Sequence, residues 1–101
     1  MIQKEWIQII NQVFEIDKKT VNKEELTSVY RNVERIYTFL ESMDIGIINP
    51  IGQTYSDTRT DCEATILENG NMQIVEVLKP IIYYNDGSQK HLIQKGIVIV
   101  K

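Results

Sequence analysis

The sequence is poor in the residues on which most metal and thiol chemistry depends. It has one cysteine, Cys62, and one histidine, His91. A single cysteine forms no internal disulfide, and we expect no metal site and no cofactor. Basic residues are also in deficit, with 11 Lys and Arg against 14 Asp and Glu and a net charge of −3. Because they are dispersed and phosphate binding needs a clustered basic face, a nucleic-acid partner is not expected.

Long hydrophobic runs are missing as well. No apolar stretch reaches the length of a membrane span and no signal peptide is visible, so we expect a cytoplasmic protein without membrane contact. The composition is that of a soluble globular protein, with 43% hydrophobic and 25% charged residues. The length allows one ordinary domain or two very small ones, and a very small piece is marginally stable alone. If helices and sheet form separate pieces, we expect one of them to need a partner.

Two stretches in the first half have helical periodicity. In the first, apolar residues form a single stripe made of Ile2, Trp6, Ile9, Ile10, Val13 and Ile16. The second is predicted to begin at Asn22, an N-cap residue followed by Glu24 and Glu25 in the first turn. It is predicted to run to Met43, with Gly46 as the left-handed residue that ends it.

The second helix carries an apolar heptad seam, with spacings of three and four residues. The seam consists of Leu26, Val29, Val33, Ile36, Leu40 and Met43. Two helices of one hairpin bury only one face against each other, and apolar seam residues left in water would cost most of the margin of stability. We therefore predict a homodimer in which two hairpins form a four-helix bundle. The alternative is that the helices pack on the sheet of their own chain.

The second half reads as short strands separated by turn residues. The predicted strands are Cys62–Leu67, Met72–Leu78, Ile81–Tyr84, Leu92–Ile93 and Ile97–Val100. Residues 68–71 and 85–87 are predicted hairpin turns, and Pro80 indicates a sheet edge or a bend. The predicted fold class is α+β, with a helical hairpin for dimerisation over residues 1–46 and a small all-β domain over residues 47–101. Residues 45–52 are interpreted as the linker.

No catalytic constellation is recognisable, so we predict a protein that is not an enzyme and has no small-molecule substrate. His91 has no cysteine nearby to activate, and a solvated or turn histidine is the preferred interpretation. Cys62 alternates with Ala64 and Ile66 on an expected inward face, which favours a small core residue over a nucleophile.

Two further clusters have both a functional and a structural interpretation. Asp57, Asp61 and Glu63 form either an acidic patch or an ordinary solvated loop, and their spacing matches no calcium loop. The pair Tyr83–Tyr84 is a candidate partner anchor. Adjacent strand residues face opposite sides, however, so at least one of the two is expected in the core.

An ordered set of segments resembles the GrpE family, the nucleotide exchange factors of DnaK-type chaperones. The second helix, Asn32–Met43, resembles the end of the family's helix, and Ile47–Gly52 resembles its Asp/Asn-Pro-hydrophobic-Gly turn. Glu63–Ala64 matches the Glu-Ala that opens a strand, Ile74–Lys79 resembles a Val-Leu-Gln-Lys segment, and Ile97–Val100 resembles the closing strand. The resemblance runs from about residue 22 to the end.

The sequence also departs from the family. Cys62 stands where the family has a histidine, and His91 lies near the position of an arginine that helps to bind the chaperone. The segment before residue 22 is too short for the long N-terminal coiled-coil stalk, so we expect a short, divergent member without it. The resemblance implies a homodimer whose β-domains bind the nucleotide-binding domain of the chaperone and promote ADP release. The partner-binding residues implied are Leu78, Lys79, His91, Gln94 and Val100.

A second hypothesis follows from these departures. The chain would then be a dimeric protein-interaction or scaffold module that keeps the GrpE-like shape but binds a different partner.

Overall fold

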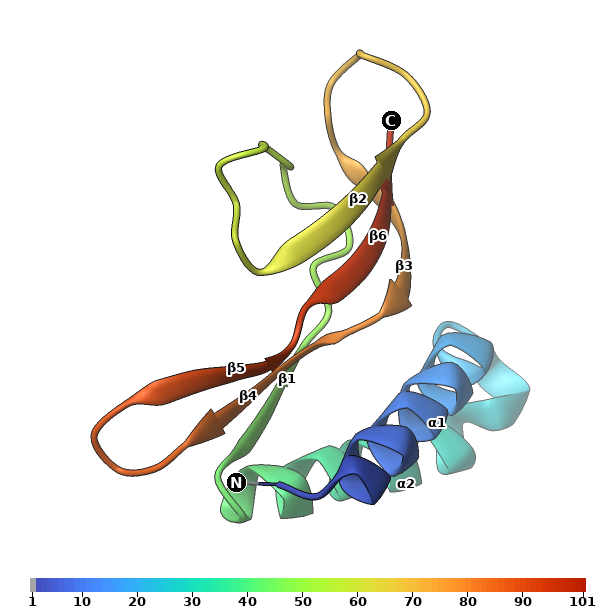
Figure 1. The fold of residues 1–101 in the computed structure, drawn as a ribbon. Helices are drawn as coiled ribbons and strands as arrows, with labels where there is room; N and C mark the ends of the chain where they lie inside the picture. Colours follow the sequence, from blue (N-terminus) through green and yellow to red (C-terminus); the bar gives the residue numbers. More distant parts are fainter. Residues whose placement is uncertain (1) are drawn as a thin grey trace.

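The computed structural model describes residues 2–101 and has an α+β architecture, with two helices followed by six strands in two small sheets (Figure 1). The helices are α1 (Lys4–Thr20) and α2 (Thr27–Ser42), with a 3₁₀ turn at Glu24–Leu26 between them. The strands are β1 (Ile45–Ile48), β2 (Cys62–Ile66), β3 (Ile74–Lys79), β4 (Ile81–Asn85), β5 (Lys90–Gln94) and β6 (Gly96–Val100). The predicted helical hairpin followed by short strands is confirmed. Within residues 2–101, no helix combines the length and apolarity that a membrane span requires.

The strands form two sheets, with orders β1-β4-β5 and β2-β6-β3. The predicted hairpin at residues 85–87 is confirmed, since β4 and β5 pair antiparallel. The predicted hairpin at residues 68–71 is wrong, because β2 and β3 do not pair with each other and β6 lies between them. β6 is the strand with most buried residues, and its position at the centre covers both of its edges.

The chain crosses between the two sheets at Pro80 and again at Gly96. Pro80 is buried between β3 and β4, as expected for a bend where no ladder donor is needed. A Cβ on Gly96 would meet Ile81 Cγ1 at 3.0 Å and Cys62 Sγ at 3.3 Å. A glycine is required here because its backbone lies against Ile81 of the other sheet and Cys62 of the neighbouring strand β2.

The helix ends differ from the predictions. Asn22 is not an N-cap: its φ is 62°, in the turn after α1, and α2 begins at Thr27. The left-handed residue after α2 is Asp44, with φ 66°, and Gly46 lies inside β1. The linker prediction is also wrong for residues 45–48, because they pair with β4 as a strand. Residues with a short polar side chain tolerate the left-handed region, so glycine was not needed at the helix end.

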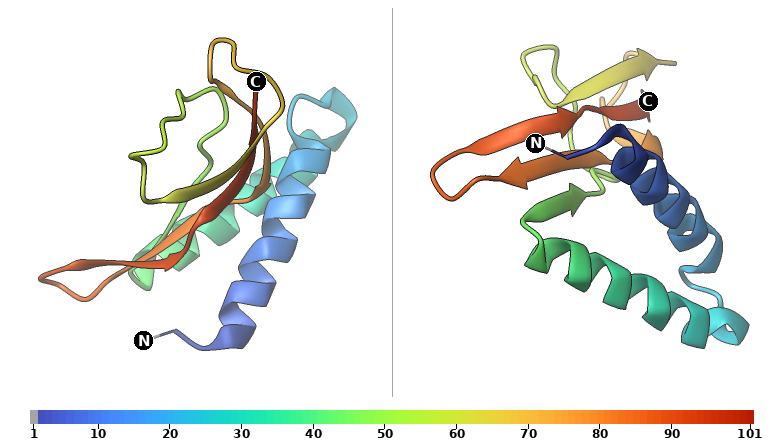
Figure 2. Two further views of the ribbon diagram at one scale, coloured as in Figure 1. Left: turned by 45° about the horizontal axis from the view of Figure 1, so that its top comes forward. Right: turned by 60° about the horizontal axis from the view of Figure 1, so that its bottom comes forward.

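Two hydrophobic clusters join the helices to the sheets. In one, Phe14 of α1, 1% exposed, packs against strand residues that include Ile81 and Val98. In the other, Ile10 of α1 and Leu40 of α2 pack against β1 and β4. Figure 2 shows α1 lying along the sheets. The helices therefore pack on the sheets of their own chain, which was the alternative to the four-helix bundle of a homodimer. The dimer itself stays a prediction. The division at residues 46 and 47 stays a prediction.

Candidate partner-binding surfaces

The β4–β5 hairpin projects from the body of the molecule and is called the arm below (Figures 1 and 2). Asp86 holds the turn at the tip of the arm. Its Oδ1 atom accepts hydrogen bonds from the backbone N–H groups of Ser88, at 3.0 Å, and Gln89, at 2.8 Å. The other oxygen, Oδ2, lies 2.6 Å from Nε2 of His91. The hydrogen bond to His91 and those to the backbone hold the pKa of Asp86 well below its usual range. His91 lies in β5 and is partly buried, so it is not itself a turn residue, but its side chain anchors the turn through Asp86.

The two tyrosines of the arm point to opposite sides of the sheet. Tyr84 packs against the cluster that contains Ile45, and Tyr83 packs against the cluster that contains Phe14. Both tyrosines are partly buried, as expected for at least one of them. The Lys90 ammonium lies 4.2 Å from the centre of the Tyr83 ring, a cation–π contact.

The five predicted partner-binding residues do not form one surface. Leu78 is 42% exposed and Lys79 is exposed, both at the end of β3 beside the crossing at Pro80. His91 lies on the arm. Val100 is 0% exposed in the core, so it contacts no partner in this fold, and the prediction is wrong for it. The physical reason is that β6 is a central strand, and Val100 is opposite Ile74.

Gln94 is occupied inside the chain. Its side-chain amide exchanges hydrogen bonds in both directions with that of Asn11 on α1, each at 3.0 Å. It also donates to the carbonyl of Pro80 at 2.8 Å. Gln94 therefore fixes α1 to the crossing between the sheets instead of offering its amide to a partner, which corrects the prediction.

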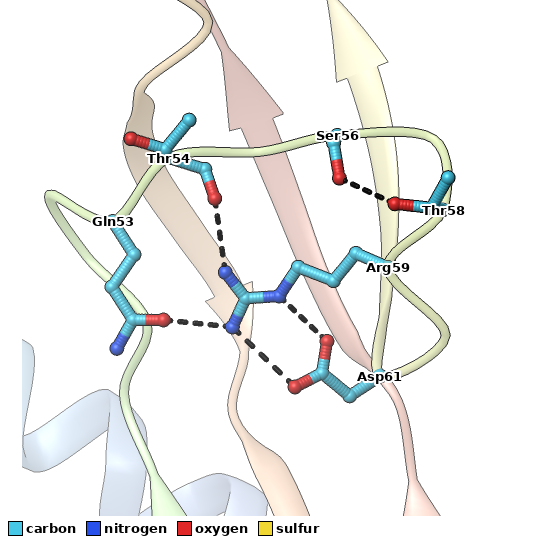
Figure 3. A network of polar contacts seen from close by, with 6 residues as sticks. All are labelled: Gln53, Thr54, Ser56, Thr58, Arg59 and Asp61. Carbon is cyan, nitrogen blue, oxygen red and sulfur yellow. Dashed lines mark hydrogen bonds and ion pairs between the residues drawn. The ribbon is translucent and has the colours of Figure 1, made fainter.

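A loop before β2 is held by Arg59, a residue that sequence reasoning missed (Figure 3). Its guanidinium donates to both Asp61 oxygens at 2.6 and 3.4 Å, to Gln53 Oε1 at 2.7 Å and to the Thr54 carbonyl at 3.2 Å. The hydrogen bond from Arg59 is the main cause of a lowered pKa at Asp61. The neighbouring Cys62 is 4% exposed, and burial raises the pKa of its thiol. The expected core role of Cys62 is confirmed.

Of the two interpretations of Asp57, Asp61 and Glu63, the structure does not support the acidic patch, because the three side chains have separate surroundings. Asp61 is bound to Arg59, Asp57 is exposed on the loop, and the Glu63 side chain lies 4.0 Å from Lys95. Across the described part of the chain, no three His, Cys, Asp or Glu residues are grouped in a way that suits a metal ion.

Some side chains of the heptad seam are buried in the monomer, and others are exposed on its surface. Val33 and Leu40 are 2% and 3% exposed and pack within the monomer, so these two are not available to a second copy, which corrects the prediction. Val29, Ile36 and Met43 are 38–44% exposed. Four further large apolar side chains of the helices are at least 37% exposed, namely Trp6, Ile9, Ile16 and Phe39. These seven exposed residues are called the outer face below.

Two of the hollows that border the helices are lined in part by large apolar side chains. Trp6 of α1 and Met43, which directly follows α2, line one hollow of about 230 Å³ together with Tyr84 of the arm. A larger groove of about 560 Å³ lies between the α1–α2 turn and β3 and includes Val21 and Val75. Neither contains a constellation of nucleophile, base and orienting group.

Comparison with protein-family models, with curated proteins and with solved structures gives no match to this chain.

Proposed function

We propose that the chain is a GrpE-like co-chaperone that binds the nucleotide-binding domain of a DnaK-type chaperone and promotes ADP release. The ordered sequence matches from residue 22 to the end support this proposal, together with two helices preceding a small two-sheet unit. The observation that carries it is the exposure of Leu78 and Lys79. They end the segment that resembles the family, and they lie where the β unit bends into its projecting arm.

The mechanism needs no catalytic side chain. The protein would bind the open, nucleotide-poor conformer of the chaperone more tightly than the closed one and so shift the population. By linkage, ADP affinity falls by the same factor, and a thousandfold effect needs about 4 kcal/mol of differential binding. The exposed Leu78–Lys79 junction and the arm with His91 are the parts of the β unit proposed to make that contact.

We also propose that the protein is a homodimer built on the outer face of the helices. Its seven large apolar residues are each at least 37% exposed. Exposed apolar side chains that gather on one surface mark sites of protein association. Pairing two such faces gives four helices in contact, with Ile36 and Met43 rather than Val33 and Leu40 at the interface. Such pairing would bury side chains that are costly to leave in water.

A second candidate is a dimeric interaction module with a different partner. Two observations favour it: Val100 is buried, and Gln94 is engaged with Asn11. Two of the five contacts implied by the family resemblance are therefore missing from the surface. Recovery of a chaperone in a pull-down from native lysate supports the first candidate, whereas recovery of one other protein without chaperone supports the second.

The functional test of the first candidate is the rate of ADP release from a DnaK-type chaperone. This rate should rise when the protein is added. No acceleration with any chaperone of the same organism would contradict the proposal.

A further inference from the structure

The outer edge of β5 is an open sheet edge. β5 pairs only with β4, and the backbone N–H of Asp86 donates to the carbonyl of Gln89 at 3.1 Å to close the hairpin. In an antiparallel ladder, residues alternate between bonding the partner strand and directing their N–H and C=O groups away from it. With Asn85 opposite Lys90 and Tyr83 opposite Leu92, the backbone groups of Lys90 and Leu92 therefore point outward.

The pairing on the other side of β4 leads to the same assignment. The N–H of Asn85 donates to the Asp44 carbonyl at 2.9 Å, so Asn85 faces β1 and does not bond Lys90. Both Lys90 and Leu92 are exposed, with Leu92 at 39%. Within residues 2–101, no hydrogen bond outside the ladder is assigned to their backbone groups.

Two of the other edges are covered. On β3, the Ile74 carbonyl accepts a hydrogen bond from the Gly52 N–H at 2.8 Å, and the Ile74 N–H donates to the Gln53 carbonyl at 2.9 Å. The Val77 carbonyl accepts a hydrogen bond from Lys18 Nζ at 3.1 Å. On β1, the first outward residue, Ile45, is only 4% exposed. The outer edge of β2 remains open beyond the buried Cys62, and it serves as the comparison edge below.

The edge of β5 carries one lysine, Lys90, and the side chain of this lysine leaves the backbone of the edge accessible. Proteins commonly guard an edge with a lysine that projects along it. Here the Lys90 ammonium lies 4.2 Å from the Tyr83 ring centre, over the face of the sheet. Asp86 is the one acidic residue from position 81 to 95, and it is bonded by His91. Lys90 is therefore left without a carboxylate partner on its own hairpin.

We propose that this edge binds an extended, acidic segment of a partner polypeptide as an added β-strand. The outward backbone groups of Lys90 and Leu92 bond the segment, an apolar side chain packs beside Leu92, and a carboxylate approaches Lys90. A second copy of this chain is a poorer occupant. A stable dimer buries about 1,200–2,000 Å², more than an edge of five residues supplies.

The proposal does not depend on the identity of the partner and is tested without a chaperone. The probe is a synthetic, end-blocked peptide of alternating valine and glutamate, and the readout is amide hydrogen exchange by NMR in the full chain. Saturating peptide should slow exchange at Lys90 and Leu92 about tenfold or more. The amide of His91, which faces β4, should change little. A peptide of the same charge with proline in place of valine should have no effect, because proline lacks the donor.

The Lys90→Glu variant is the charge control, since the residue is exposed. It should weaken binding of the valine–glutamate peptide about tenfold and favour a valine–lysine peptide. Unchanged exchange at Lys90 and Leu92 with saturating peptide would overturn the proposal. So would protection at Ala64 and Ile66 of β2 instead. Protection that appears at high protein concentration without peptide would assign the edge to a second copy and also contradict the proposal.

Discussion

The side-chain amides of Asn11 and Gln94 hydrogen-bond each other in both directions, each at 3.0 Å, and thereby tie α1 to the end of β5. The pair lies beside the crossing at Pro80, whose carbonyl Gln94 also contacts. It therefore fixes the angle between the helices and the arm. If partners bind the arm and a second copy binds the helices, this pair sets the geometry between the two surfaces.

The first prediction concerns the energetic coupling of this pair. Asn11→Leu or Gln94→Leu alone leaves a partly buried amide unpaired and should cost about 1–3 kcal/mol of unfolding free energy. The double variant should cost clearly less than the sum, which denaturant unfolding measures as a coupling energy. Gln8→Leu, at an exposed position of the same helix, is the control and should stay within about 0.5 kcal/mol of the parent. Additive costs would show that the amides do not act as a pair.

The second prediction separates the core of the chain from its outer face. Phe14 is 1% exposed and Phe39 is 65% exposed. Phe14→Ala should lower the unfolding free energy by about 3–5 kcal/mol, because it removes a large side chain from the cluster that joins α1 to the sheets. Phe39→Ala should leave the fold of the monomer nearly unchanged. Equal losses in thermal or denaturant unfolding would contradict the packing of α1 on the sheets.

The third prediction concerns the proposed dimer. Ile36→Asp places a charge on the exposed outer face, so it should halve the mass measured by light scattering and leave the circular dichroism spectrum folded. Val33→Asp buries the charge inside the monomer and should unfold the chain instead. A monomer mass for the parent protein in light scattering at micromolar concentration would contradict the proposed dimer.

The fourth prediction is a dependence of stability on pH through Asp61. Its pKa is lowered in the folded state from an ordinary value of 3.8, chiefly by the hydrogen bond from Arg59. The ionised Asp61 carboxylate therefore stabilises the folded state fully at a pH above its ordinary pKa. This stabilisation is lost as the pH falls through the lowered pKa of the folded state. Arg59→Met should cost about 1–2 kcal/mol near neutral pH and flatten the loss of stability below about pH 4. If the unfolding free energies of parent and variant fall equally steeply with pH in acid, Arg59 is not the cause of the lowered pKa of Asp61.

Local patterns in the sequence were sufficient to predict most elements of this fold. The runs of β-branched and aromatic residues mark the strands of the second half, and Asn85–Gly87 marks a hairpin because its turn chemistry is local. The position of β6 between β2 and β3 was not predictable in this way. It depends on a pairing between Cys62 and Gly96 and on burial from both sides, neither of which leaves a local signal.

The surfaces were harder to predict than the elements. Periodicity placed Val33 and Ile36 on one seam, but the structure buries Val33 and exposes Ile36, because α2 packs against the rest of its own chain on only part of the stripe. Arg59 and Asn11 have no motif around them, and their partners become neighbours only in the folded chain. The only sequence signal for Arg59 was the presence of polar residues beside a predicted loop that could pair with one another.

The most direct test of the proposed function is stopped-flow release of fluorescent ADP from a DnaK-type chaperone of the same organism. The parent protein should accelerate release. Leu78→Asp should reduce the acceleration at least tenfold, whereas Leu67→Asp, at another exposed leucine that lies away from the junction, should keep it. Release that stays at its basal rate with the parent protein, for every such chaperone of that organism, would contradict the account.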